Sequence, residues 1–317
     1  MIEFTVEGDA AGLRLDKFLR KKLAGVPVSH LFKMIRTKKI RVNGKRAQPE
    51  QPLQAGDAVA IRGTEDHLLG APRQTKKTLP ALDLSKLEVL FEDQWLMAIN
   101  KPAGMAVHPG SGISGGTLVD YVRAYLGPNA VRNDFAASPA HRLDRDTSGV
   151  VLVAKRRPAM VHFTDAFTHG KVKKKYLTMV KGKMPQATGT IDIGLNEHQQ
   201  SARSKARHGV KVQEARTRYK VARQARECAL LECQIETGRT HQIRRHLVAI
   251  GHPVAGDRKY GDFAFNRLAK ARWGLQRLFL HAEKIEFSHP QDQRLIRIEA
   301  QLPVELSEVW NRAAQEV

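Results

Sequence analysis

The stretch HRLDRDTSG, residues 141–149, gathers two carboxylates and two guanidinium groups in a short run of the chain. A carboxylate in such a setting can act as a nucleophile or as a general base. An aspartate near Thr-Ser-Gly, however, more often caps a helix or closes a turn. The stretch alone therefore leaves open whether Asp144, Asp146 or neither carries out chemistry.

The overall charge indicates what kind of molecule the chain binds. Its 317 residues include 53 Lys and Arg against 32 Asp and Glu, which gives a net charge of +21 and a pI near 10.2. Such an excess favours a polyanionic partner, because basic side chains neutralise phosphates and release counterions. No long apolar run stands out, so we expect nucleic acid rather than a membrane as the partner. The N-terminus shows no secretion signal, which predicts a cytoplasmic protein.

Cofactor and metal motifs are missing from the sequence. It has no GxxxxGK[ST] loop, no GxGxxG after a strand, no HExxH and no serine nucleophile elbow. The cysteines, Cys228 and Cys233, lie on one expected strand at a spacing that points them to opposite faces, so we expect no disulfide between them. We expect no metal and no cofactor, which leaves side-chain chemistry on a polymer, or binding alone.

Residues 1–63 are expected to form a small module of two helices and a sheet. Apolar residues at helical spacing predict a helix within 12–25, and Ser29 is expected to cap the next one. Asn43-Gly44 between short strands predicts a tight hairpin. The basic side chains that we expect to contact RNA follow in one stretch: Lys33, Arg36, Lys38, Lys39, Arg41 and Lys45. With RLDKFL and IRVNGK, the module resembles the S4-type RNA-binding domain.

Residues 64–84 are polar and aperiodic, which predicts a linker to a larger domain at 85–317. In that domain the expected strands are 149–156, 174–182 and 229–237, and the expected helices are 159–170 and 239–251. Strands outnumber helices and do not alternate regularly with them. The fold class that this pattern predicts is α+β with a mixed sheet.

Three polar signatures, NKPAGMAVHPG, HRLDRDTSG and ETGRTHQIRRH, lie beside these strands. Each alone could be a turn, a solvated loop or a basic helix face. Together, and in this order, they resemble the RluA-type family of RNA pseudouridine synthases, for which HRLDRDTSGVVLVAK is highly specific. The stretches GVPVSHLFKMIRTKKIRVNGKR and LPVEL are most similar to the RluC subgroup, which acts on 23S rRNA.

The resemblance implies roles for three residues. Asp144 would be the catalytic carboxylate, attacking C1′ or C6 of the target uridine or removing H2′, and the sequence does not choose among these. Arg239 would lie beside Asp144 as its cation, because an ionised carboxylate in a pocket needs one. Tyr176 would stack on the flipped uracil near C5, where a proton must leave.

The remaining residues of these motifs are expected to serve the loop and the RNA. Arg142 would fill the space left by the extruded nucleotide or contact phosphate, and Asp146 would be scaffolding that caps the turn or pairs with Arg145. His141 is expected to fix the loop through a hydrogen bond. The basic stretch 201–223 is expected to be a loop along the RNA path that becomes ordered only on RNA.

The sequence therefore predicts a monomeric enzyme that isomerises uridines of 23S rRNA, either free or in an assembling large subunit. One alternative is a non-catalytic rRNA-binding assembly factor, which would have no use for Asp144, Tyr176 and Arg239. The other is the same chemistry on tRNA. The S4-like module argues against tRNA, because family members that modify tRNA commonly lack it.

Overall fold

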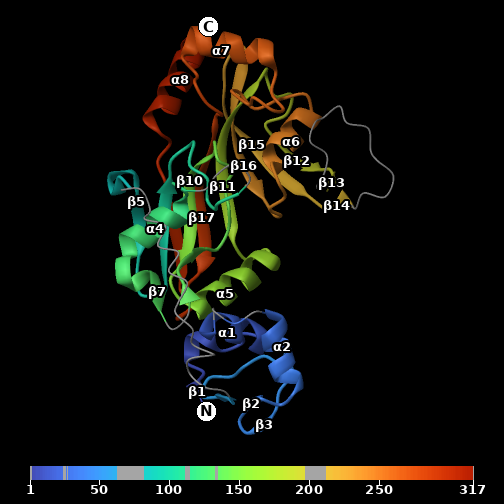
Figure 1. Ribbon diagram of the computed structural model, residues 1–317. Helices are drawn as coiled ribbons and strands as arrows, with labels where there is room; N and C mark the ends of the chain where they lie inside the picture. Colours follow the sequence, from blue (N-terminus) through green and yellow to red (C-terminus); the bar gives the residue numbers. More distant parts are fainter. Residues whose placement is uncertain are drawn as a thin grey trace.

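The computed structural model contains a small N-terminal domain and a larger C-terminal domain (Figure 1). It describes residues 2–23, 26, 28–62, 82–110, 115–132, 135–196 and 212–316. Most of the expected linker lies outside these residues. Leu82 packs against the core of the larger domain, so the described part of that domain begins within the stretch expected to be linker.

The N-terminal domain packs two helices on a small sheet. Its helical segments are η1 (Gly8–Ala10), α1 (Leu15–Lys22) and α2 (Val28–Arg36). The sheet has the order β1-β4-β2-β3, with β1 at Ile2–Thr5, β2 at Ile40–Val42, β3 at Lys45–Arg46 and β4 at Ala58–Ile61. Phe18 and Leu19 of α1 share one buried core with Leu31 and Ile35 of α2, as the helical spacing predicts.

The hairpin of this domain has the predicted turn. Asn43 and Gly44 have φ values of 51° and 73°, the left-handed conformation that a two-residue hairpin turn requires. The Asn43 side chain also accepts a hydrogen bond from the Ala58 backbone N–H at 2.8 Å, which ties the turn to β4. The prediction for α2 was two residues late: the helix begins at Val28, and Ser29, the expected N-cap, lies in its first turn.

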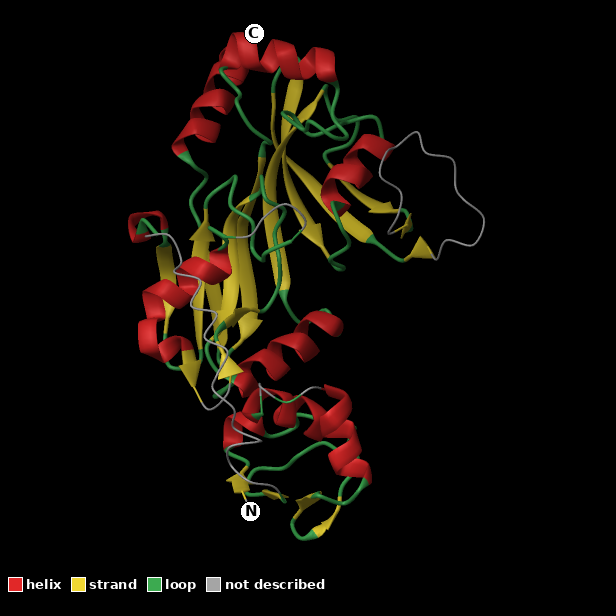
Figure 2. Cartoon of the chain, in the orientation of Figure 1, coloured by secondary structure: helices red, strands yellow, loops and turns green. Residues whose placement is uncertain are grey.

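In the described part of the larger domain, ten strands form one mixed sheet (Figure 2). Eight of them run in the order β12-β15-β16-β11-β17-β10-β6-β5. Their bounds are β5 Glu88–Glu92, β6 Leu96–Lys101, β10 Ser148–Ala154, β11 Lys173–Lys181, β12 Thr188–Asp192, β15 Arg216–Gln224, β16 Cys228–Ile235 and β17 Leu280–Ser288. β9 (Ser138–Pro139) pairs with β10, and β18 (Leu295–Glu299) pairs with β17. The α+β prediction is confirmed.

Short elements complete the larger domain. These are η2 (Leu84–Lys86), η3 (Gly127–Ala130), and the strand pairs β7 (Val131–Arg132) with β8 (Phe135–Ala136) and β13 (Leu195–Asn196) with β14 (Val212–Gln213). The helices are α4 Leu118–Leu126, α5 Arg157–Thr168, α6 Gln242–Ala249, α7 Phe263–Trp273 and α8 Val304–Gln315. None of the described helices has the length and apolar character needed to cross a membrane.

Helices cover both faces of the sheet, which explains why β10 is buried along its whole length. Val151 and Val153 face the core that contains α4 and α6, whereas Val150 and Leu152 face the core that contains α5. A third cluster lies between the sheet and helices α7 and α8. A strand covered on both faces reads as a continuous apolar run, and GVVLVA is such a run.

Strand β16 confirms the prediction for the cysteines. Both are free and buried, with Cys233 in the core of α4 and α6 and Cys228 in that of α7 and α8. The neighbouring strand corrects another prediction. Residues 197–211 lie outside the described part, but β15 makes Arg216–Gln224 a paired strand of the sheet, not a loop. Its buried Thr217 and Tyr219 alternate with exposed basic residues, and this period of two is the signal that was missed.

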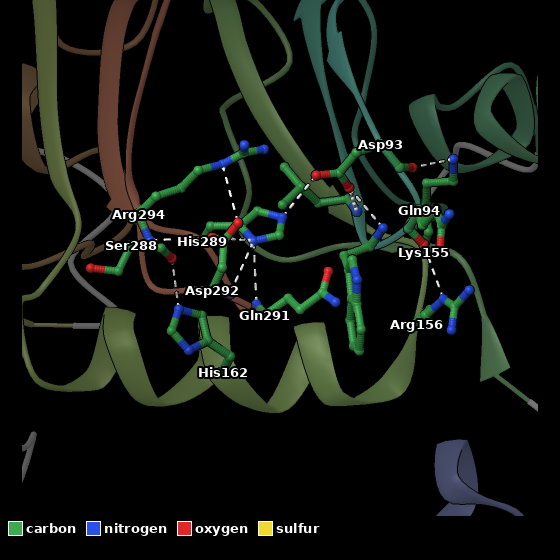
Figure 3. A network of polar contacts seen from close by, with 12 residues as sticks. Asp93, Gln94, Lys155, Arg156, His162, Ser288, His289, Gln291, Asp292 and Arg294 are labelled. Carbon is green, nitrogen blue, oxygen red and sulfur yellow. Dashed lines mark hydrogen bonds and ion pairs between the residues drawn. The ribbon is translucent and has the colours of Figure 1, made fainter.

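At the end of the sheet nearest α5, a polar network joins two turns (Figure 3). The buried ring of His289 lies between Asp93 Oδ2 at 2.8 Å and Asp292 Oδ1 at 2.9 Å. Asp93 also accepts hydrogen bonds from the backbone N–H groups of the β5–β6 turn. In addition, α5 contacts the N-terminal domain, because Arg157 Nε donates to the Ala11 carbonyl at 3.2 Å. The network therefore ties the β5–β6 turn to the turn that follows β17.

Replacing Gly149 by alanine should destabilise the larger domain by about 3 kcal/mol or more. Gly149 has a φ of 116°, and an added Cβ would lie 2.2 Å from the Ala282 carbonyl oxygen, where β10 pairs with β17. Urea unfolding followed by circular dichroism measures the loss. Gly115→Ala is the matched control, because nothing lies within 4 Å of a Cβ there. Equal stability of the two variants would contradict the prediction.

Candidate active site

Asp144 lies in a tight turn that leads directly into β10. Its carbonyl accepts a hydrogen bond from the Thr147 N–H at 3.1 Å, which closes the turn. The NKPAG turn supports the Asp144 turn through a second backbone hydrogen bond. The N–H of Gly104 donates to the carbonyl of Arg145 at 2.8 Å. Asp146 pairs with Arg145 at 3.2 Å near the surface, which confirms the predicted pairing.

Lys101, at the end of β6, is the second support of this turn. Its buried ammonium donates to the carbonyls of Pro102 at 2.8 Å, Met105 at 2.9 Å and Arg145 at 3.1 Å. Burial lowers the pKa of Lys101 to about 7, against the opposing charge of Asp144. The lysine of NKPAG therefore positions the turn that carries Asp144, a role that the sequence analysis did not assign.

His141 fixes the other end of the turn, as expected. Its Nε2 accepts a hydrogen bond from the backbone N–H of Leu152 at 3.0 Å, so the ring is bound in its neutral form. Burial lowers the pKa of His141 to about 3, and the charge of Lys174 acts in the same direction.

This histidine predicts a loss of stability in acid. The unfolded chain binds the proton near pH 6.5 and the folded chain only near pH 3, so stability falls as the pH drops between these values. In His141→Gln the free energy of unfolding should therefore decrease less between pH 7 and pH 4. Urea unfolding at each pH measures this, with the exposed His169→Gln as the control. An unchanged pH dependence in His141→Gln would contradict the account.

The cation beside Asp144 is Arg244. Its Nη1 donates to Asp144 Oδ2 at 3.0 Å, while Nε and Nη2 bind both oxygens of the buried Asp257 at 2.7 and 2.8 Å. Burial opposes the charge of Arg244, but the two carboxylates outweigh it and raise the pKa of Arg244. Burial likewise opposes the charge of Asp257, and Arg244 holds the pKa of Asp257 below its usual range. The guanidinium is thereby fixed in the orientation that meets Asp144.

The expectation that Arg239 is this cation is corrected. Arg239 lies before α6, is exposed, and donates through Nε to the Glu214 carbonyl at 3.1 Å. Arg244 lies in the first turn of α6 and points inward beside Ile243. The helix start decides which arginine of RTHQIRR faces the carboxylate. Arg239 still lines the same cavity, so a part for it in the site remains a prediction.

His241 is a further neighbour that the sequence analysis did not single out. It has a φ of 53°, a conformation that a residue other than glycine adopts at a cost. Its Nδ1 lies 2.9 Å from the Tyr260 hydroxyl and its Nε2 lies 3.7 Å from Asp144 Oδ2. The guanidinium of Arg244 lies over the Tyr260 ring, 5.1 Å from its centroid. Tyr260 therefore contacts two neighbours of the carboxylate, the His241 ring through its hydroxyl and the Arg244 guanidinium through its ring face.

Asp144 faces a cavity of about 390 Å³. Its walls combine aromatic and apolar side chains with polar groups at the carboxylate end: Phe167, Tyr176, Ile243, Leu280, Asp144, His241 and Arg244. Burial and the charge of Asp144 both raise the pKa of Tyr176, so the phenol stays protonated at neutral pH. The cavity brings Asp144 and Tyr176 together, and it can hold a flat ring next to a carboxylate.

A second hollow, of about 440 Å³, meets this cavity at the carboxylate. Both are lined by Arg142, Asp144, His241 and Arg244. The second adds basic side chains in place of aromatic ones: Arg145, Arg258, Lys259 and Arg277. Arg142 is exposed between the two hollows, where a guanidinium can meet a phosphate.

The other predicted RNA contacts lie in the N-terminal domain, on α2, in the turn that follows it, and on the β2–β3 hairpin. They are Lys33, Arg36, Lys38, Lys39, Arg41 and Lys45. Lys33 and Arg36 share a shallow hollow with Arg46 and the exposed ring of Phe32. Exposed cations beside an aromatic ring suit a nucleic acid surface.

Comparison with known proteins shows the class to which this fold and site belong. The model of the family "RNA pseudouridylate synthase" matches residues 95–249, and that of the "S4 domain" matches residues 13–59. These matches include the HRLD turn and the whole of α6 in the first, and α2 with the hairpin in the second.

The curated relatives extend the match over nearly the whole chain. "Ribosomal large subunit pseudouridine synthase C" of Salmonella typhimurium and that of Escherichia coli K12 are each 39% identical over 300 residues, covering 93% of this chain and 91% of theirs. The protein of that name from Vibrio cholerae is 35% identical and covers 98% of this chain and 96% of its own. The chain therefore belongs to the RNA pseudouridine synthase family and is an enzyme of the isomerase class.

A solved structure agrees with the fold. "Human RNA Pseudouridylate Synthase Domain Containing 4" superposes with a TM-score of 0.58 at 25% sequence identity, covering 71% of this chain and 92% of the human chain.

Proposed function

We propose that this enzyme converts uridines of the 23S rRNA of the large ribosomal subunit to pseudouridine, with Asp144 as its catalytic carboxylate and without a cofactor. One observation carries the proposal. Asp144 Oδ2 is bound by Arg244 at 3.0 Å and faces a cavity that Tyr176 also lines. The relatives are 35–39% identical to this chain, and their names refer to the large ribosomal subunit. These names support large-subunit rRNA as the substrate.

The reaction needs only side chains, because it is an isomerisation. The bond between N1 and C1′ breaks, a bond between C5 and C1′ forms, the hydrogen at C5 leaves as a proton, and N1 gains a proton. No electrons and no atoms are gained or lost overall. A carboxylate can act at C1′ or C6 or at H2′, and Arg244 orients Asp144 through a charge-assisted hydrogen bond.

The two hollows suggest how a nucleotide would lie. The flat ring fits the cavity with the aromatic walls, while the backbone would follow the basic hollow that begins at Arg142. The sugar would then lie beside Asp144, which lines both hollows. The N-terminal basic surface would hold a more distant part of the rRNA. We propose that the enzyme acts in the cytoplasm as a monomer, on free rRNA or on an assembling subunit.

Mapping pseudouridines in a strain that lacks the gene tests the choice of RNA. Carbodiimide treatment followed by reverse transcription marks each pseudouridine, and we expect specific stops in 23S rRNA to vanish and to return with the wild-type gene. Loss of stops in tRNA instead would assign the chemistry to tRNA. No change in any RNA, together with a defect in subunit assembly, would favour the binding-factor alternative.

A further inference from the structure

Lys174 faces the cavity of Asp144 and has no place in the mechanism above. It lies on β11, two residues before Tyr176, and both side chains line the cavity. Residues two apart on a strand share one face. The ammonium lies 5.3 Å from the centroid of the Phe167 ring, at the end of α5. Lys174 therefore places a cation on the wall of the cavity in which the uracil ring would contact Tyr176.

The ammonium of Lys174 pairs with no carboxylate among the residues that the structure describes. The carboxylates of the cavity are bound elsewhere: Asp144 to Arg244 at 3.0 Å, and Glu236 to Arg218 at 2.7 Å. The next residue, Lys175, shows what a structural lysine on this strand does. It binds two carboxylates, at 2.8 and 3.4 Å.

A partly buried cation without a counter-ion costs stability, because it loses water without gaining a partner. Such a group in a cavity is a candidate for contact with a ligand. The ligand must offer an acceptor rather than a donor, because an ammonium has three N–H donors and no lone pair. It must also be compatible with the flat, aromatic walls of the cavity.

We propose that Lys174 donates a hydrogen bond to the O4 carbonyl of the target uracil and so selects uracil over cytosine. This inference rests on the proposed function. Uracil offers an acceptor at O4, whereas cytosine offers an amino donor at that position, which would face the ammonium. The same contact stabilises the negative charge that the ring gains when the bond from N1 to C1′ breaks, because that charge spreads to the carbonyl oxygens.

The position of Lys174 in the cavity favours a contact of its ammonium with O4 over a contact with the sugar side of the uracil ring. Lys174 lines the cavity with the aromatic walls but not the basic hollow, which meets that cavity at Asp144. Lys174 therefore lies toward the end of the cavity away from Asp144. A uracil whose C1′ or C6 meets Asp144 turns its O4 edge to that end.

The proposal predicts an alkaline limb in the pH–rate profile, that is, a fall in the rate of isomerisation as the pH rises. Burial lowers the pKa of Lys174 to about 8, so the cation is present at neutral pH and is lost as the pH rises through about 8. The titratable and charged groups that face it from the neighbouring elements are His141, Tyr176, Glu236 and Arg239, with Arg142, Asp144, His241 and Arg244 farther along the cavity. Of these, Glu236 is paired, and burial keeps His141 neutral and Tyr176 protonated in this range.

The test compares Lys174→Met and Lys174→Arg with Lys173→Met, which removes an exposed lysine from the same strand. Single-turnover rates on 23S rRNA fragments are measured from pH 6 to pH 10. We expect Lys174→Met to be about 10- to 100-fold slower than wild type, the cost of one charge-assisted hydrogen bond, and to lack the alkaline limb. Lys174→Arg should recover most of the rate and move the limb upward, and Lys173→Met should match wild type.

Measurements of RNA binding give a second test that does not depend on turnover. The dissociation constant of an RNA with cytosine at the target position is compared with that of the uracil RNA, in an Asp144→Asn background. We expect the preference for uracil to fall about 10-fold in Lys174→Met. A wild-type rate and limb in Lys174→Met, or equal losses in the Met and Arg variants with an unchanged base preference, would overturn the proposal. If wild type isomerises no RNA, the proposed function fails, while the base preference still decides the role of Lys174.

Discussion

Replacing Asp144 by asparagine should lower the rate of isomerisation by about 10⁴-fold or more, the loss seen when the central group of a catalytic constellation is removed. Asparagine keeps the shape of the side chain but cannot act as a nucleophile or as a base. Arg244 remains bound to Asp257 through two hydrogen bonds, so the fold should be retained. Single-turnover assays with nucleoside analysis of the RNA measure the rate, and fluorescence anisotropy measures RNA binding.

The neighbouring aspartate is the matched control. Asp146 lies in the same turn and pairs with Arg145 near the surface. Asp146→Asn should therefore stay within about twofold of the wild-type rate, because an exposed pair contributes little. RNA affinity should be similar in both variants. If Asp146→Asn were the inactive variant, or if Asp144→Asn kept its rate, the assignment of the catalytic carboxylate would be wrong.

Replacing Arg244 by methionine should affect both activity and stability. Asp144 would lose its cation, and Asp257, which is 1% exposed, would be left buried and without its bidentate partner. Removing one member of a buried ion pair costs about 3–5 kcal/mol, and we expect a loss of activity of at least about 10²-fold, since Asp144 loses the charge-assisted hydrogen bond that orients it. Urea unfolding and single-turnover rates measure the two effects.

Two further variants separate charge from geometry. Arg244→Lys keeps the charge, but an ammonium lacks the planar fork that binds Asp257 through two parallel hydrogen bonds while a third nitrogen reaches Asp144, so it should recover little activity. Arg239→Met removes an exposed arginine from the same motif and should leave stability unchanged. An unstable, inactive Arg239→Met beside a normal Arg244→Met would contradict the arrangement of this site.

The sequence predicted those features that depend on local spacing. Asn43-Gly44 predicts its turn because both positions need positive φ, and the run in β10 predicts a strand covered on both faces. Cys228 and Cys233 face different cores because side chains alternate along a strand. In each case the information lies within a few residues, so the tertiary structure did not change the outcome.

The pairing within the site could not be predicted in this way. Three arginines lie within RTHQIRR, and only the exact start of α6 places Arg244, rather than Arg239, at the carboxylate. Asp257, which fixes Arg244, lies in a separate loop after that helix. The spacing of Ile243 and Leu247 on the buried face gave a usable signal, because Arg244 lies next to that face.

Lys101 shows a second limit. A lysine before Pro-Ala-Gly reads as an exposed turn residue, yet it is fully buried and donates to three carbonyls. One of these carbonyls belongs to Arg145, 44 positions away in the chain. A contact over such a separation depends on the pairing of β6 with β10, which local patterns do not specify.

The most direct test of the central claim is tritium release from 23S rRNA that carries tritium at C5 of uridine. Isomerisation must expel the hydrogen at C5, so release reports chemistry rather than binding. We predict that the wild-type enzyme releases tritium, from free rRNA or from precursor particles, to a plateau set by the number of target uridines. Binding of the same rRNA without release, in both forms, would contradict an enzyme that acts on 23S rRNA.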